Sequence, residues 1–209
     1  MPCNTHALAA STTECITMSA HDLSFWRDLR AQLTVPRAAF IDGNPVHASD
    51  NSSLTTSNPA TGEALADVAA CTAEDVNYAV AAARRIFNAG DWSEAAPATR
   101  KAVLQRLSTL ITENREELAL LETLDTGKPI RDAFELDIPG VAACFNWYAE
   151  ATDKLYGEVA PTDNDNLATI TREPVGVVAA VVPWNFPLDI TAWKLAPALA
   201  AGNSGILKP

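Results

Sequence analysis

Apolar residues recur at helical spacing through most of this sequence. A first amphipathic segment covers about residues 21–33, and the last lies at about residues 138–156, before Gly157. Three segments between them have the apolar faces Val76, Val80, Ala83 and Phe87; Val103, Leu104, Leu107, Leu110 and Ile111; and Leu118, Leu121 and Leu124. The apolar face of the last segment consists of Val141, Phe145 and Tyr148. Because positions three and four apart share one face of a helix, the pattern predicts a helix-rich part over residues 21–157.

Start, stop and turn signals accompany these segments. Thr72–Asp75 (TAED) has the spacing of a capping box, and the helix it opens is expected to end at Gly90. Pro97 suits the first turn of the next helix, and Gly127 stops the one after it. Between the first two helices, Asp42-Gly43 separates two short apolar pieces, which predicts a β-hairpin turn.

The pattern changes towards the end of the chain. Residues 166–173 alternate apolar and polar side chains, as a half-exposed strand does, whereas Val175–Val182 is almost continuously apolar and β-branched. The second pattern predicts a strand buried on both faces of a parallel sheet. A helix over Leu188–Ala201 and a strand over residues 204–208 (SGILK) would complete one βαβ crossover. The expected fold class is therefore α/β.

Composition and charge narrow the class of protein. The 209 residues are 48% hydrophobic and 20% charged, which is enough apolar material for a core. The formal net charge of −11 argues against nucleic-acid binding, which needs basic residues. Without an apolar run of about 18 residues, no membrane span is expected.

Four cysteines, Cys3, Cys15, Cys71 and Cys144, have no CxxC spacing and no clustered histidines near them. A zinc site is not expected, and the chain has the cysteine usage of a reduced, cytoplasmic protein. Cys144 is expected in the core, on the apolar face of its helix. Residues 1–20 lack Lys and Arg and are expected to be a disordered leader, with Met18 as an alternative true start.

The candidate chemistry lies in Pro183–Pro187 (PWNFP), where the apolar strand ends. Ligands of open α/β sheets bind beyond the carboxyl ends of strands. Two prolines stiffen this turn, and Asn185 offers one neutral N–H donor, as an oxyanion hole requires. The alternative is an asparagine that only hydrogen-bonds its own turn. From the local sequence by itself, Trp184 is interpreted as an aromatic residue that packs against its neighbours.

Two lysines are further candidates. Lys194 and Lys208 each adjoin an apolar stretch, where a lysine either extends its ammonium to water or binds a ligand. Lys208 ends a strand at the same sheet edge as Asn185, where an ammonium could meet a ribose or phosphate. No GxGxxG or GxxxxGK[ST] loop occurs in the chain, so the usual dinucleotide fingerprint is missing.

The stretch VVPWNFPLDITAWKLAPALAAGNSGILKP, residues 181–209, resembles the signature of the NAD(P)-dependent aldehyde dehydrogenases. The resemblance extends through five upstream motifs: NPATGE (58–63), AGDWS (89–93), LDTGKPIRDA (124–133), YAEATDKLYGE (148–158) and REPVGVV (172–178). It covers roughly residues 40–209. Gly205 departs from the family, whose members usually carry a larger residue there, and glycine weakens a strand.

The resemblance implies a role for each matching residue. Asn185 matches the amide that holds the oxyanion formed after thiolate attack, and Lys208 matches the lysine at the adenosine ribose. The positions that match the cofactor cleft are Val181, Pro183, Trp184 and Lys194, the last of which is also a candidate for proton relay. Thr56 and Asp125 match positions that bind a monovalent cation in some members. NAD or NADP is the implied cofactor and an aldehyde the implied substrate.

The resemblance also implies a domain layout. Residues 21–157 would be the helix-rich N-terminal part of the cofactor-binding domain, 158–174 strands of an oligomerisation arm, and 175–209 the first βαβ of the NAD(P)-binding domain. Family members are more than twice this length and form dimers or tetramers. The catalytic domain, with its nucleophilic cysteine and general-base glutamate, is expected beyond position 209, so the 209-residue chain alone is expected to be inactive.

Within the family, the chain is most similar to the group that oxidises γ-glutamyl-aminobutyraldehyde, betaine aldehyde or retinal-type substrates. An alternative is a non-catalytic fragment that associates with a full-length relative. A complete small nucleotide-binding domain is a third reading, against which the missing phosphate loop counts.

Overall fold

The computed structural model describes residues 21–209, and the predicted leader lies outside them. The described residues fall into two units, 21–32 and 33–209. The described part of the first unit contains helix α1 (Leu23–Gln32), which confirms the helix predicted there. Asp22 caps it, because its carboxylate accepts a hydrogen bond from the Phe25 amide at 2.9 Å.

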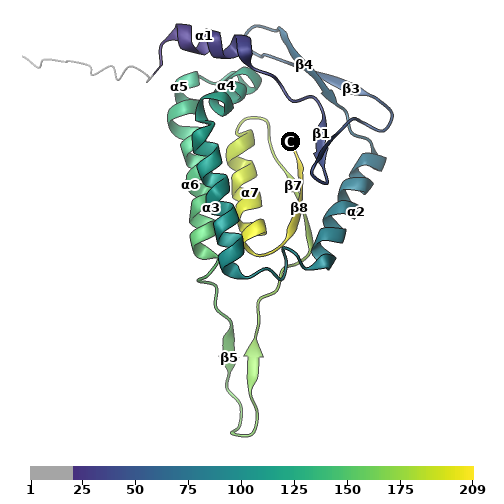
Figure 1. Ribbon diagram of the computed structural model, residues 1–209, viewed down its shortest axis with the longest axis vertical. Helices are drawn as coiled ribbons and strands as arrows, with labels where there is room; N and C mark the ends of the chain where they lie inside the picture. The colour runs from purple at the N-terminus through teal and green to yellow at the C-terminus, as the bar shows by residue number, and fades with distance from the viewer. Residues whose placement is uncertain (1–20) are drawn as a thin grey trace, which may run out of the picture. The chain divides into compact units, whose positions relative to one another are not determined.

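The second unit contains all other described elements. Its helices are α2 (Ala73–Ala89), α3 (Pro97–Glu113), α4 (Arg115–Thr126), α5 (Ile130–Asp132), the π-helical η1 (Ala133–Asp137), α6 (Ile138–Ala151) and α7 (Pro187–Ala200). Its strands are β1 (Ala39–Ile41), β2 (Asn44–Val46), β3 (Ser53–Ser57), β4 (Ala64–Ala69), β5 (Glu158–Ala160), β6 (Ala168–Ile170), β7 (Val177–Val181) and β8 (Ser204–Lys208). In Figure 1, α7 lies between the α3/α6 pair and strands β7 and β8, and α2 lies on the other side of these strands.

The core lies where α3, α6 and α7 meet. Its buried members are Leu104, Val141, Phe145, Ala149, Ala192, Ala196 and Ala200. The three alanines of α7 recur every four residues and form a smooth stripe on one face. A stripe of small side chains lets α7 pack closely against α6, which supplies the larger side chains of this cluster. Helix α7 is thereby fixed against the helical layer.

Strands β7 and β8 are parallel and joined by α7, which confirms the predicted βαβ unit. Their register pairs Val177 with Ser204 and Val181 with Lys208. Buried Asn203 fixes the other end of the pair, because its Oδ1 accepts from the Gly176 amide at 3.0 Å. The carboxyl ends of both strands therefore meet at one edge.

The other strands form three antiparallel hairpins. In the predicted turn between β1 and β2, both Asp42 (φ 53°) and Gly43 (φ 76°) have positive φ, as a type I′ turn requires. The β3–β4 hairpin has no counterpart among the sequence predictions. Strands β5 and β6 pair within residues 158–174, and Figure 1 shows this hairpin extending away from the helices.

Three predicted boundaries are wrong in detail. Helix α6 ends at Ala151, not near Tyr156, because the Thr152 amide donates to the Ala149 carbonyl three residues back, which tightens the chain into a turn. Gly157, predicted as the helix stop, instead lies against the hairpin, where a Cβ atom would come within 2.7 Å of the Ile170 carbonyl oxygen. The predicted strand over residues 166–173 shortens to β6.

The prediction of a strand buried on both faces over Val175–Val182 is also wrong. Val175 is 92% exposed and precedes β7, while Val181 at its end is 65% exposed. Only two strands pair in this sheet within residues 21–209, so each retains an open edge. Apolar, β-branched composition correctly indicated the strand but not its burial.

Helix α2 begins with the predicted capping box. The Thr72 hydroxyl accepts from the Glu74 amide at 3.2 Å, and Asp75 accepts from the Thr72 amide at 2.7 Å. The Asp75 carboxylate also receives the Ser49 amide at 3.1 Å, which ties the preceding loop to the helix. Hydrogen bonds from Thr72 lower the pKa of Asp75, although burial opposes this change.

Replacing Thr72 by alanine should lower the free energy of unfolding by about 1 kcal/mol, because an orphan helix amide loses its acceptor. The urea midpoint at unchanged m-value measures this. Thr99→Ala, at an exposed position of α3, is the matched control and should leave the midpoint nearly unchanged. Equal shifts for the two variants would contradict a capping role.

Candidate functional site

The candidate site is the turn between β7 and α7. Val182 extends the strand pairing by one hydrogen bond, from its amide to the Lys208 carbonyl at 3.1 Å. Pro187 then occupies the first turn of α7, where its missing N–H costs nothing. The helix cap, Phe186, makes no side-chain capping bond. The turn is therefore held by strand pairing at one end and by proline at the other.

Asn185 and Trp184 are both exposed on this turn, Trp184 to 86%. Within residues 21–209 the Asn185 side chain has no hydrogen-bond partner, so the reading of an asparagine that bonds its own turn finds no support. Its amide is available as a donor at the carboxyl edge of the sheet. Trp184 and Val181 provide exposed apolar surface beside it.

Lys208 lies opposite Val181 in the β7–β8 register, at the same edge as the turn. In the described chain its ammonium bonds only the Pro209 carbonyl, at 2.6 Å, and no carboxylate. The structure thus brings Asn185, Val181, Pro183 and Lys208 to one edge. Lys194 is exposed in the middle of α7, about 10 Å along the helix axis from Pro187 at 1.5 Å per residue.

The two predicted cation ligands lie together. The Thr56 hydroxyl donates to the Asp125 carboxylate at 3.0 Å, although 69 residues separate them. This bond satisfies the hydroxyl without an ion. In residues 21–209, no three His, Cys, Asp or Glu side chains gather as they would around a metal. A role in cation binding stays a prediction.

A mostly buried ion network, formed by Lys128, Glu122 and Asp137, contacts the turn through Phe186. The Lys128 ammonium bonds Glu122 at 2.8 Å and Asp137 at 2.5 Å, and the Glu122 side chain is fully buried. The same ammonium lies 4.3 Å from the centre of the Phe186 ring, a cation–π contact. Since Phe186 is next to Asn185 in the chain, Lys128 links α4 and η1 to the turn that presents the amide.

The charges in this network shift one another's pKa values. Burial raises the pKa of Glu122, and Lys128 opposes the rise. Burial alone would lower the pKa of Lys128, but its bonds to Asp137 and Glu122 outweigh this and raise it. The two carboxylates are therefore paired with a lysine that loses its proton less readily than an exposed one.

Asp189 lies in the first turn of α7 and is half-buried. Within the described chain its carboxylate makes no hydrogen bond or ion pair. Burial is the main cause that raises its pKa to about 6, and the negative charges of Asp137 and Glu122 add to it. Sequence reasoning missed Asp189, Lys128, Glu122 and Asp137. The available signal for Asp189 was a single acidic residue in a mostly apolar helix.

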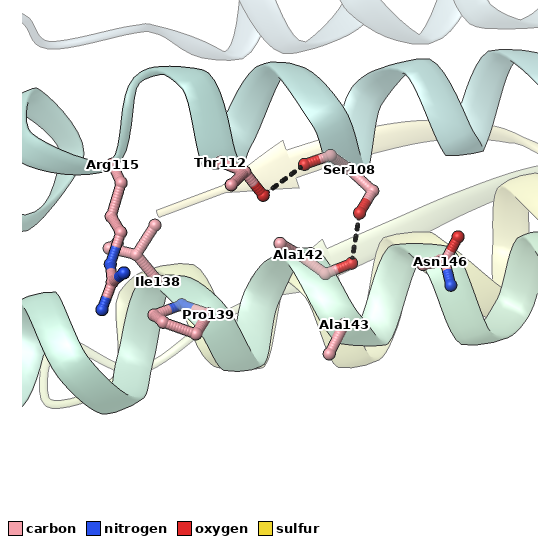
Figure 2. Close-up of a pocket in the computed structure, with 8 residues that line it drawn as sticks. All are labelled: Ser108, Thr112, Arg115, Ile138, Pro139, Ala142, Ala143 and Asn146. Carbon is pink, nitrogen blue, oxygen red and sulfur yellow. Dashed lines mark hydrogen bonds between the residues drawn. The ribbon is translucent and has the colours of Figure 1, made fainter.

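Two surface hollows lie on α6, and one of them has no functional character. This hollow, of about 320 Å³, lies between α3 and α6, and Figure 2 shows the residues that line it. The Ser108 hydroxyl donates to the Ala142 carbonyl at 2.7 Å, and Thr112 donates to Ser108 at 3.0 Å. Arg115 bonds the Phe134 carbonyl and lies over its ring. These polar groups serve the helices themselves.

The second hollow, of about 350 Å³, is lined by Cys144, Trp147, Tyr148 and Trp193. Cys144 is half-buried and packs against the core, as predicted. Burial raises its pKa, and the Asp189 charge adds to the rise. Cys71 is exposed, but partial desolvation of its thiol, together with the Asp75 charge, also raises its pKa. Neither thiol of the described chain has the lowered pKa that marks an activated nucleophile.

None of the described helices is long and apolar enough to cross a membrane.

Comparisons with known proteins agree with this architecture. The model of the aldehyde dehydrogenase family matches residues 46–209. An NADP/NAD-dependent aldehyde dehydrogenase of Escherichia coli, PuuC, is 54% identical over 192 residues, covering 92% of this chain and 39% of the relative. The aminoacetaldehyde dehydrogenase of Pseudomonas aeruginosa is 51% identical, covering 87% of this chain and 36% of the relative.

Solved structures give the same result. The γ-glutamyl-γ-aminobutyraldehyde dehydrogenase of Burkholderia cenocepacia has a TM-score of 0.87 at 54% identity, covering 89% of this chain and 38% of that one. An indole-3-acetaldehyde dehydrogenase solved with NAD⁺ has a TM-score of 0.88 at 51% identity, with the same coverage. The chain belongs to the aldehyde dehydrogenase family, and it has the N-terminal part of that fold. It spans about two fifths of the length of these curated relatives.

Replacing Lys128 by methionine should lower the free energy of unfolding by about 3 kcal/mol or more at pH 8, because two buried carboxylates lose their counter-charge. Carboxyls whose folded pKa is raised lose stability as pH rises through that pKa. The loss should therefore be smaller at pH 5 than at pH 8, as measured by urea unfolding at both values.

Lys154→Met is the control, since Lys154 is an exposed lysine with two carboxylate neighbours. Its effect should be much smaller and should not grow between pH 5 and pH 8. A Lys128→Met loss that is independent of pH would show that packing, not charge, explains the effect.

Proposed function

We propose that this chain forms the oxyanion donor and part of the cofactor cleft of an NAD(P)-dependent aldehyde dehydrogenase, which oxidises an aldehyde to a carboxylic acid. The observation that carries the proposal is the β7–β8 register, which brings Lys208 to the sheet edge next to the turn of Asn185. The Asn185 amide has no partner in the described chain, and the Lys208 ammonium bonds only the Pro209 carbonyl. Family membership supports the same assignment.

The proposed role of Asn185 is electrostatic. When a thiolate adds to an aldehyde carbon, negative charge develops on the carbonyl oxygen. A neutral amide fixed beforehand stabilises that charge at no cost of reorganisation. The Lys128–Phe186 contact and Pro187 hold the backbone on the C-terminal side of Asn185. The asparagine is thereby positioned before a substrate binds.

The attacking thiolate is assigned to a part of the protein outside these residues, as is the glutamate that activates water. Cys71 and Cys144 both have raised pKa values, which disfavour the thiolate. Lys194 is exposed and without a described partner, so it stays a candidate for the cofactor cleft or for proton relay.

NAD or NADP fits the residues at the edge. Lys208 offers hydrogen-bond donors for ribose hydroxyls, and exposed Val181, Pro183 and Trp184 offer apolar surface along the cleft. When bound, the dinucleotide would supply the hydride acceptor. A chain without a glycine-rich loop can use this edge because two strand ends and one ammonium replace the loop.

Several broader assignments belong to the same proposal. The β5–β6 hairpin pairs edge to edge and makes an arm suited to dimer or tetramer formation. Residues 21–157 and 175–209 would form the cofactor-binding domain around it. The Thr56–Asp125 pair would contribute to a monovalent-cation site. We place the protein in the cytoplasm.

The substrate is proposed to be a short aldehyde with an amino group. The name of one relative describes such a compound, aminoacetaldehyde, and that of another describes a longer aldehyde whose γ-nitrogen is an amide, γ-glutamyl-γ-aminobutyraldehyde. The alternative, a non-catalytic fragment that associates with a full-length relative, would retain the hairpin contact but produce no NADH.

Asn185→Ala, in the protein expressed from its complete coding sequence, should lower kcat by about 10²- to 10³-fold, as loss of one oxyanion donor does. NADH formation from propanal measures this. Asn166→Ala, which removes an amide in the hairpin loop, is the control and should change kcat less than threefold. A wild-type protein with no activity towards any aldehyde would refute the proposed function.

Lys208→Gln should raise KM for the dinucleotide about tenfold while kcat at saturation changes little, because a charge-assisted hydrogen bond is lost in the ground state. Lys194→Gln provides a comparison on α7. If Lys208→Gln lowers kcat without changing KM, the ribose role is wrong.

A further inference from the structure

The turn between β1 and β2 combines two residues that can react with each other. It consists of Asp42 and Gly43, and nowhere else in the 209 residues does an aspartate or asparagine precede a glycine. Both residues are exposed, and a Cβ atom at Gly43 would contact nothing within 4 Å beyond its chain neighbours. A glycine in open surroundings leaves its backbone nitrogen accessible to the carboxyl group of the residue before it.

The hairpin that contains this turn is small. Strands β1 and β2 have three residues each and, in the described chain, pair only with each other. Pro45 in the middle of β2 has no amide hydrogen to donate. Asp42 has a left-handed backbone (φ 53°), which is unfavourable for most residues that carry a side chain. Two-stranded hairpins are marginally stable by themselves, so local opening of this turn requires little free energy.

Arg85 of α2 holds the carboxyl group of the turn. Its Nη2 donates to both carboxylate oxygens of Asp42, each at 2.6 Å, although 43 residues separate the two side chains. Ring closure onto the next backbone nitrogen removes one of these oxygens, so it cannot proceed while Arg85 binds both. Within residues 21–209 the Gly43 amide donates no hydrogen bond, so no similar contact restrains the nitrogen. The arginine therefore acts on the one step that the turn itself leaves open.

We propose that Asp42-Gly43 is a site of isoaspartate formation and that Arg85 sets the rate of this modification. The Gly43 nitrogen bonds to Cγ of Asp42, and one carboxyl oxygen leaves as water with the carboxyl proton and the amide proton. Water then opens the five-membered imide at one of its two carbonyl carbons. Opening at Cγ restores aspartate, whereas opening at the main-chain carbon leaves the chain running through the side chain. The sequence of steps is not a redox reaction and needs only water.

Isoaspartate at position 42 changes the turn in two ways. It lengthens the main chain by one carbon atom, which disturbs the pairing of Ile41 with Asn44 that closes the hairpin. It also moves the carboxylate to the former backbone carbonyl, away from the position that Arg85 binds. This exposed α-carboxylate is the group that S-adenosylmethionine-dependent isoaspartyl methyltransferases recognise. The inference does not rest on the proposed function, because it requires neither an aldehyde nor a dinucleotide.

The test ages the protein expressed from its complete coding sequence at physiological temperature and neutral pH. Methyl transfer from radiolabelled S-adenosylmethionine by an isoaspartyl methyltransferase counts the modified residues, and peptide mapping locates them. Arg85→Gln should form isoaspartate at residue 42 about two- to fivefold faster than the unaltered protein, as loss of one exposed ion pair predicts.

Two further variants are controls. Arg84→Gln changes the net charge equally on the same helix, but Arg84 lies over the Phe87 ring instead, so the rate should stay at that of the unaltered protein. Asp42→Glu keeps the charge but would have to close a six-membered ring, so methyl incorporation at this position should fall to background. The remaining aspartates in the same peptide map are an internal control for unfolding.

The outcomes separate the site from the role of Arg85. Absence of isoaspartate at residue 42 in the unaltered protein and in Arg85→Gln alike would overturn the site. Equal rates in these two proteins, or equal acceleration by Arg84→Gln, would overturn only the role of Arg85. An increase at all aspartates in Arg85→Gln would also overturn that role, because it would show that the variant acts by unfolding the chain. None of these readouts uses catalytic activity.

Discussion

The buried ammonium of Lys128 is the interaction on which the candidate site depends. It joins Glu122 of α4 and Asp137 of η1, and it contacts the Phe186 ring at the start of α7. Ionised groups in a low-dielectric interior are stable only when they are paired in good geometry. Three separate segments must therefore come together before any one of the charges is tolerated. Because Lys128 also contacts Phe186, the same pairing helps to position the turn that carries Asn185.

The irregular helix before α6 follows from the same constraint. The described chain has π-helical hydrogen bonding over Ala133–Asp137, directly before α6. A π-helical turn changes the direction in which later side chains point, and such turns are frequent at functional sites. Here it ends at the carboxylate that Lys128 requires. On another face of α7, the alanine stripe packs closely against the core, and the polar network adds a contact with Phe186 at the start of the helix.

Much of this fold could be predicted from local signals, because those signals act within a few residues. The Thr72–Asp75 capping box, the Asp42-Gly43 turn and the β7–α7–β8 unit are all present. Predictions that required knowledge of distant partners were less accurate. Gly157 was assigned to a helix end because its true neighbour, the Ile170 carbonyl, is distant in sequence. The burial of Val181 was overestimated because apolar composition cannot reveal how many strands a sheet contains.

The candidate site shows the same division. Asn185 and Lys208 were identified by their places at strand ends, and the register brings their strands together. Thr56 and Asp125 were paired only through family resemblance, and the structure joins them by a hydrogen bond. Lys128 could not be identified by composition, since most lysines lie at the surface. Its burial depends on carboxylates supplied by two other segments.

The electrostatics of the site oppose the chemistry proposed for it. Glu122, Asp137 and Asp189 surround the single ammonium of Lys128, and this excess of negative charge opposes the negative charge proposed to develop on a carbonyl oxygen at Asn185. The arrangement limits this conflict in two ways. Glu122 and Asp137 are neutralised at short range by Lys128, so their fields at the turn are weakened. Burial raises the pKa of Asp189 to about 6, so this carboxyl group carries its charge less readily than an ordinary one. The charged groups that hold the turn therefore repel the proposed oxyanion less than their number suggests.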